Sequence, residues 1–211
     1  MLLLAVLQLW AALSAQAWDN HQMRAAAQRL GPNAVAAVEP LQSMLRAAQT
    51  QDEAAKLSAA NQFFNLRLRF APDIEVWGQD EHWATPLQAL NAGAGDCEDY
   101  AIGKYTVLLA MGVPHTRLRL VYVRAKLPDL ATPVPHMVLA YYAIPNAEPL
   151  ILDNLQAAIV PASQRPDLAP VFSFNSESLW QGVGQAAAGS AMARLSRWRE
   201  TWARIQLEGL L

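Results

Sequence analysis

The chain has 211 residues, a formal net charge of −2 and 53% hydrophobic residues. The nearly balanced charge excludes the basic surface typical of nucleic-acid-binding proteins, and the apolar content excludes a mainly disordered chain. A single cysteine excludes a disulfide framework within the chain. Residues 18–211 show no break in composition, so we expect one domain with a sizeable core.

The N-terminal segment, residues 1–17, is predicted to be a signal peptide. Its apolar run, Leu2–Leu13, is too short to span a bilayer, and the small-x-small pattern Ala15–Ala17 is typical of a cleavage site. No Lys or Arg precedes the apolar run, which departs from the usual signal pattern. The alternative is an ordinary apolar N-terminal helix. With cleavage, the mature chain begins at Trp18 and is exported.

Three helices are predicted next, and we expect them to serve as scaffold. They cover 19–30 with Asp19 or Asn20 as cap, 35–48, and 52–65. The segment 66–70 alternates charged and apolar residues, so it is either a short strand or a helix end. The polar and aromatic stretch 77–86 has no clear period and is predicted to be a loop.

The only cysteine, Cys97, follows the glycine-rich turn Gly93–Gly95 and directly precedes a helix predicted from Glu98 to about Met111. Gly112 and the proline at 114 end that helix. A thiol at a helix N-terminus lies at the positive end of the helix dipole, which favours the reactive thiolate. The alternative is that Cys97 is merely a small buried residue of a core helix.

Later segments supply partners for a nucleophilic cysteine. Residues 117–124 are predicted to form a central strand, and 136–142 and 150–155 a hairpin around the turn 144–149. Such a hairpin would bring His136 and Asp153 together. The order Cys97, His136, Asp153 then matches a triad of nucleophile, general base and orienting carboxylate. His82 is the competing base. His115 is excluded because it lies at the far end of the Cys97 helix, about 25 Å away.

The remaining chain is predicted to contain irregular short strands over 159–178 and an amphipathic helix over 190–207. The apolar stripe of that helix is either core or a docking surface; its members are Met192, Leu195, Trp198, Trp202 and Ile205. The predicted fold class is α+β, with the N-terminal helices and the nucleophile helix packed on an antiparallel sheet.

The run from Phe63 to about Trp180 resembles the bacterial transglutaminase-like cysteine proteinases, and among them the LapG-type periplasmic proteases. Seven segments carry this resemblance in order: Trp77–Asp80, Trp83–Pro86, Gly95–Ala101, Leu118–Val123, His136–Tyr142, Leu152–Leu155 and Pro170–Asn175. The resemblance implies a papain/transglutaminase-like core and a thiol endopeptidase with the triad Cys97, His136 and Asp153.

The resemblance also implies a biological setting. It implies a periplasmic enzyme that cleaves the N-terminal region of a large surface adhesin at a small-residue site, which releases the adhesin and disperses a biofilm. It implies sequestration by the periplasmic domain of a LapD-like inner-membrane receptor for cyclic di-GMP. Two other classes remain open: a transglutaminase-like acyl transferase or amidase, and a non-catalytic binding module on the same fold.

In such enzymes an upstream side chain helps the backbone N–H of the nucleophile to stabilise the oxyanion. The candidates here are Gln79 and the indole N–H groups of Trp77 and Trp83. The alternative for both tryptophans is that they only pack the loop.

Acidic residues surround the cysteine and predict a calcium site. Asp96, Glu98 and Asp99 flank Cys97, and like charges close to a thiol raise its pKa. A bound cation would offset this effect, and hard oxygen ligands suit Ca²⁺. The alternative is that these are ordinary first-turn acids of a helix. The resemblance adds support, because it implies a calcium-dependent enzyme with acidic residues at positions 96 and 98.

Overall fold

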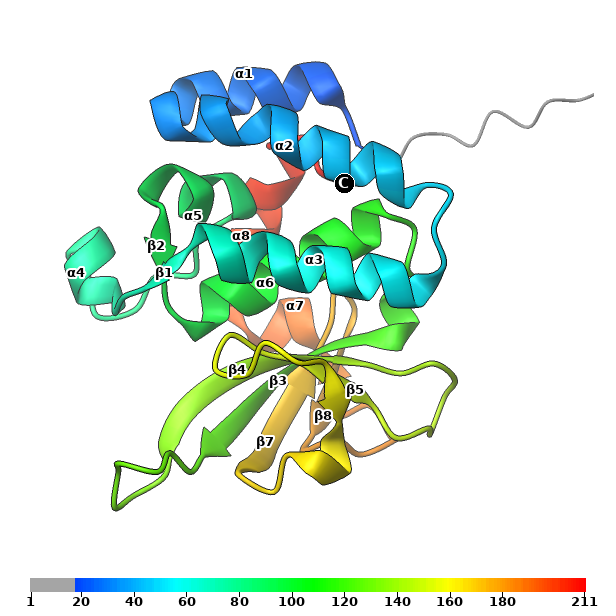
Figure 1. The fold of residues 1–211 in the computed structure, drawn as a ribbon. Helices are drawn as coiled ribbons and strands as arrows, with labels where there is room; N and C mark the ends of the chain where they lie inside the picture. Colours follow the sequence, from blue (N-terminus) through cyan, green and yellow to red (C-terminus); the bar gives the residue numbers. More distant parts are fainter. Residues whose placement is uncertain (1–17) are drawn as a thin grey trace, which may run out of the picture.

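The computed structural model describes residues 18–211, so the predicted signal peptide lies outside the described residues. In Figure 1 the helices gather on one side of an antiparallel sheet, which confirms the predicted α+β class. The α-helices are α1 (Asn20–Leu30), α2 (Pro32–Ala48), α3 (Glu53–Arg67), α4 (Asp73–Trp77), α5 (Pro86–Ala92), α6 (Cys97–Ala110), α7 (Ala191–Arg194) and α8 (Ser196–Gln206). The 3₁₀ turns are η1 (His115–Arg117) and η2 (Ala162–Gln164).

The N-terminal helices form where the capping signals predict them. The Asp19 side chain caps α1 by accepting the N–H groups of His21 and Gln22, and Asp52 caps α3. Helix α2 begins three residues before the predicted start, because Pro32 fits the first helical position, where no N–H is needed. Helix α3 extends to Arg67, and strand β1 (Arg69–Phe70) follows almost at once, so both interpretations of 66–70 are partly right.

Two short helices flank the predicted loop and were not expected. Helix α4 ends at Trp77, and α5 begins at Pro86, so the loop itself covers only residues 78–85. Thr85 and Gln88 form a reciprocal capping box at the start of α5. Gly93 ends α5 with φ 65°, and strand β2 (Ala94–Gly95) pairs in parallel with β1. Both helices are too short for a hydrophobic period to reveal them.

The main sheet has the order β6-β5-β4-β3-β7-β8-β9, and all neighbours are antiparallel. Its strands are β3 (Leu118–Ala125), β4 (Val134–Tyr141), β5 (Leu150–Leu152), β6 (Val160–Pro161), β7 (Leu168–Phe174), β8 (Ser178–Gln181) and β9 (Gly189–Ser190). Strand β3 is central and β4 and β5 form a hairpin, as predicted. The short strands expected within the irregular segment 159–178 are β6 and the seven-residue β7. A register shift opposite Tyr122 and Val123 accommodates Pro170, which lacks an N–H.

The core lies between the helices and one face of the sheet. Helix α6 packs on β3 and β4 and is almost entirely buried, while α3 packs on α6. The predicted C-terminal helix is interrupted at Leu195, which separates α7 from α8. Trp198 and Ile205 of α8 are fully buried, which confirms the core interpretation of its apolar stripe. Among residues 18–211, no helix has the length and apolar character needed to cross a membrane.

Candidate active site

Cys97 is the first residue of α6, one residue earlier than the predicted helix start. Asp96 is the N-cap, and its side chain accepts the backbone N–H of Glu98 at 3.3 Å. An aspartate at this position satisfies an N–H group that the helix leaves unpaired. The local sequence therefore places the Cys97 sulfur at the positive end of α6.

The surroundings of Cys97 favour the thiol over the thiolate while the acids are ionised. The sulfur donates to Glu98 Oε2 at 2.7 Å. Burial is the main cause that raises the thiol pKa well above its ordinary value, and the Glu98 and Asp96 charges add to it. A hydrogen bond from the Met137 backbone N–H lowers the thiol pKa and so partly opposes these effects. This contact places the sulfur against β4 at Met137, which directly follows His136.

The β4–β5 hairpin brings His136 and Asp153 together. His136 lies on β4 and Asp153 directly follows β5, and Nε2 of the histidine is 2.8 Å from Oδ1 of the aspartate. Both side chains are buried. Because Nε2 faces Asp153, Nδ1 is the ring nitrogen left to exchange a proton with a reacting group. The predicted pairing of these two residues across the hairpin is confirmed.

Three further contacts hold Asp153 in place. The Leu155 N–H donates to Oδ1 at 3.2 Å, Asn65 of α3 donates to the Asp153 carbonyl at 2.9 Å, and Arg165 Nη2 lies 2.8 Å from Oδ2. Burial alone would raise the Asp153 pKa, but the hydrogen bond and charge of His136, with Leu155 and Arg165, lower it to about 2. Asp153 is therefore a carboxylate at neutral pH.

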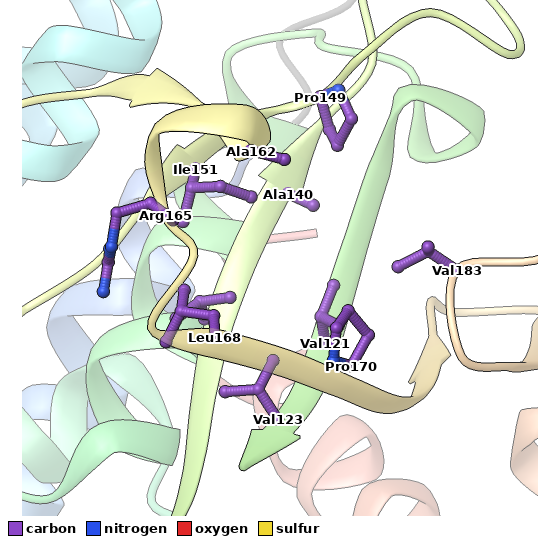
Figure 2. Close-up of a pocket in the computed structure, with 11 residues that line it drawn as sticks. Val121, Val123, Ala140, Pro149, Ile151, Ala162, Arg165, Leu168, Pro170 and Val183 are labelled. Atoms are coloured by element: carbon purple, nitrogen blue, oxygen red, sulfur yellow. The ribbon is translucent and has the colours of Figure 1, made fainter. Parts of the chain in front are cut away.

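Arg165 was not predicted to contribute to the site. Its guanidinium also binds the Asp167 carboxylate at 2.8 and 3.0 Å. Figure 2 shows Arg165 in the wall of a mainly apolar pocket of about 110 Å³. Val121, Val123 and Val138 of this pocket belong to a second, smaller apolar cluster of the sheet. Neither Cys97 nor His136 lines the pocket. The pocket is therefore separate from the reactive groups, and Arg165 lies at its border with the site.

The acidic residues around Cys97 fall into two overlapping groups. One contains Asp96, Cys97 and Glu98, and the other contains Asp73, Asp96 and Asp99; the potential ligand atoms of each group lie within 4.8 Å of one another. Asp73 is the first residue of α4 and was not predicted to belong to the site. Only its position in the first turn of a very short helix could have drawn attention to it.

Burial makes the charged forms of these carboxylates costly. It raises the pKa of Asp73 to about 6 and that of Asp99 to about 7. Burial followed by the charges of Glu98 and Asp99 also raises the pKa of Asp96. Such groups must bind protons or a cation, because several buried like charges cannot remain uncompensated. Carboxylate oxygens in this arrangement fit a calcium ion.

The oxyanion candidates lie on the 77–86 segment. Gln79 is exposed, whereas Trp77 is partly buried and Trp83 is buried. Neither indole N–H has a hydrogen-bond partner among residues 18–211. Trp83 stacks on Phe174 and lines a cavity of about 290 Å³ together with Glu98. The indoles retain a free donor for an oxyanion, and their role stays a prediction.

His82 and His115 do not have a similar carboxylate partner in the site. The His82 ring packs on Trp77 with centroids 4.6 Å apart, and burial lowers the pKa of His82. His115 lies at the start of η1, beyond the far end of α6, and pairs with Glu177 at 3.3 Å. Of these histidines, only His136 is bound to a buried carboxylate next to the Cys97 strand contact.

Comparisons with known proteins agree with this geometry. A family model described as bacterial transglutaminase-like cysteine proteinase matches residues 35–172. The EGTA-treated structure of Legionella pneumophila LapG is 33% identical, with a TM-score of 0.77 over 90% of this chain and 100% of that chain. The calcium-bound LapG structure is 33% identical, with a TM-score of 0.74 over 89% and 99% of the two chains. No curated protein gave a significant match.

Proposed function

Because the chain belongs to the bacterial transglutaminase-like cysteine proteinase family, we propose that it is a calcium-dependent endopeptidase with the triad Cys97, His136 and Asp153. The observation that carries this proposal is the buried His136–Asp153 pair at 2.8 Å, next to the Met137 N–H that contacts the sulfur. This arrangement supports a general base on the strand that contacts the sulfur, with an ionised carboxylate as its partner.

The proposed reaction is acyl transfer to water. His136 takes the thiol proton through Nδ1, and the Cys97 sulfur bonds to the scissile carbonyl carbon. His136 then gives that proton to the leaving amine as the C–N bond breaks. Water attacks the thioester with His136 again as base, which releases the acid and restores the thiol. Asp153 holds the imidazole in the productive tautomer. The Cys97 backbone N–H and an indole N–H of Trp77 or Trp83 are proposed to stabilise the oxyanion.

Calcium is proposed to bind beside the nucleophile in this scheme. The acidic residues beside the sulfur, including the predicted ligands Asp96, Glu98 and Asp99, would hold the ion, and its positive charge would offset theirs. The calcium-bound state of LapG, to which the chain is similar, supports this part of the proposal.

The proposed substrate is the N-terminal region of a large surface adhesin, cut at a small-residue site in the periplasm. Release of the adhesin would promote biofilm dispersal. The proposed regulator is the periplasmic domain of a LapD-like receptor for cyclic di-GMP. The similarity to LapG supports these assignments. The cavity lined by Trp83, Glu98 and Tyr122 offers a place for substrate residues near the nucleophile.

The test is incubation of the purified protein with an adhesin N-terminal fragment and mass measurement of the products. We expect two fragments whose masses sum to the substrate plus one water, and no change with Cys97→Ala. A cross-linked product or one that has incorporated an added amine would identify an acyl transferase instead. An unchanged substrate that binds equally well to both proteins would indicate a binding module.

A further inference from the structure

Two neighbouring cavities form a groove that begins beside the nucleophile. Tyr122 lies opposite Met137 in the register of β3 and β4, and the Met137 N–H contacts the Cys97 sulfur. Glu98, which also contacts the sulfur, lines the cavity of about 290 Å³ together with Tyr122. This first cavity, in which the proposed function places substrate residues, therefore lies directly beside the reacting atom.

A second cavity, of about 430 Å³, continues the groove over β7 and β8. It shares Phe172, Arg194 and Leu195 with the first cavity, so the two are contiguous. Leu179 of β8 adds to its apolar lining, and α7, which ends at Arg194, lies close to β8 (Figure 1). A peptide that runs from the sulfur through both cavities would therefore make contacts several residues away from the scissile bond.

Arg194 lies where the two cavities meet and has no counter-ion. Among residues 18–211, it is the only charged residue that lines the second cavity, and no carboxylate pairs with its guanidinium. Arg197, which lines the first cavity, is instead paired with Glu81 at 2.8 Å. The guanidinium of Arg194 lies close to Gly189, where an added Cβ would come within 3.1 Å of Nε. The junction of the groove thus presents an uncompensated positive charge.

We propose that Arg194 binds a carboxylate side chain of the substrate, so that the enzyme selects an acidic residue a few positions from the scissile bond. This inference rests on the proposed endopeptidase function. A guanidinium presents a planar fork of N–H donors that matches the two oxygens of a carboxylate. The acidic side chain would lie toward the second cavity, because Glu98 lines only the first cavity and like charges there would repel it.

The test uses a synthetic peptide library with a central Ala–Ala pair and random residues at several positions on each side. The wild type, Arg194→Gln, Arg194→Glu and the control Arg199→Gln are incubated with it, and the cleaved peptides are identified by mass spectrometry. Arg199 is an exposed arginine of α8 that donates to the Met192 carbonyl and lines neither cavity. Circular dichroism checks that each variant is folded.

We expect Asp and Glu to be enriched at one flanking position for the wild type and for Arg199→Gln. The enrichment should disappear in Arg194→Gln, and Lys and Arg should replace the acids in Arg194→Glu. For two peptides that differ only by Glu or Gln at that position, the wild type should prefer Glu roughly fivefold in kcat/KM, as expected of an exposed ion pair. The difference should lie in KM, because Arg194 is remote from the bonds that change, and it should shrink at high salt. A purely structural role of Arg194 would instead lower the rates for both peptides equally.

Capture of the same library on immobilised Cys97→Ala, with and without Arg194→Glu, separates binding from cleavage. Cleavage without an acidic preference, or a preference that persists in Arg194→Gln, would overturn the role of Arg194 and retain the protease. Capture of acidic peptides that depends on Arg194, without cleavage by the wild type, would retain the binding site and overturn the endopeptidase function. Neither cleavage nor capture that depends on Arg194 would overturn both.

Discussion

The guanidinium of Arg165 lies 2.8 Å from Oδ2 of Asp153, and both side chains are buried. The two oxygens of Asp153 thus have different partners, because Oδ1 accepts from His136 and from the Leu155 N–H. A carboxylate bound on both sides cannot rotate away from the imidazole without losing a buried ion pair. Arg165 is therefore a positioning residue for the proposed triad, because it acts through Asp153.

Arg165→Met should destabilise the protein most strongly at neutral pH. Asp153 has a pKa of about 2, below its ordinary 3.8, so its ionised form stabilises the fold above about pH 4. That stabilisation is lost as the pH falls toward 2. Removing Arg165 raises the Asp153 pKa and leaves a buried charge less well compensated, which we expect to cost about 3–5 kcal/mol at pH 7. Urea unfolding at pH 7 and pH 3 should show the difference from wild type shrinking in acid.

Arg46→Met is the matched control for this experiment. Arg46 pairs with Glu39 on the surface, and its side chain is 47% exposed, so its loss should cost less than about 1 kcal/mol at both pH values. Arg165→Lys, which keeps the charge but not the planar fork, should lie between the wild type and Arg165→Met. A penalty for Arg165→Met that is the same at both pH values would argue against a role through the Asp153 charge.

Asp153→Asn should reduce kcat by about four orders of magnitude because it fixes the wrong imidazole tautomer. His136→Ala should be nearly as inactive as Cys97→Ala, and non-additive with Asp153→Asn. Cleavage of the adhesin fragment, followed by mass measurement, provides the rates. His82→Ala is the control. If it proved inactive while His136→Ala kept full activity, the base would have to be reassigned.

Local signals in the sequence predicted the elements that carry the proposed triad. The glycine-rich turn before Cys97 and the stop signals at Gly112 and Pro114 indicated the helix that follows the cysteine, one residue short of its observed start. Two β-rich segments around a proline-containing turn indicated the hairpin of His136 and Asp153. These features depend on residues close together in the chain, which is why capping and strand patterns could reveal them.

The contacts that complete the site depend on tertiary packing and could not be predicted in this way. Asp73 reaches Asp96 from a five-residue helix, and Arg165 reaches Asp153 from a turn with no motif. A hydrophobic period needs about 11 residues to be recognised, so it detects neither element. The interruption at Leu195 was missed for a related reason, since the apolar stripe continues from α7 into α8.

Removal of calcium should abolish cleavage reversibly. With EGTA, the carboxylates of Asp96 and its neighbours lose the proposed compensating cation, and we expect activity to return with Ca²⁺ but not with Mg²⁺, which demands a smaller and more regular ligand shell. Cleavage of the adhesin fragment across a calcium titration provides the measurement. Full activity in excess EGTA would leave Asp96, Glu98 and Asp99 as ordinary helix-start acids.

Gly103→Ala should destabilise the contact between α3 and α6. A Cβ at Gly103 would come within 2.5 Å of the Phe64 ring, which is fully buried. Alanine favours a helix by about 1 kcal/mol over glycine, but overpacking a dense core costs about 1–3 kcal/mol, so we expect a net loss of stability and a lower Tm.

The same substitution should also reduce activity, because α3 carries Asn65, which donates to the Asp153 carbonyl at 2.9 Å. Displacing α3 would loosen the turn that holds the orienting carboxylate. Phe64→Leu provides the test of the cause: combined with Gly103→Ala, it should cost less than the sum of the two single variants, since the smaller side chain removes the clash. Strict additivity in thermal unfolding would show that the Phe64 clash is not the cause of the lost stability. An unchanged Tm for Gly103→Ala would show that the contact between α3 and α6 accommodates the added Cβ.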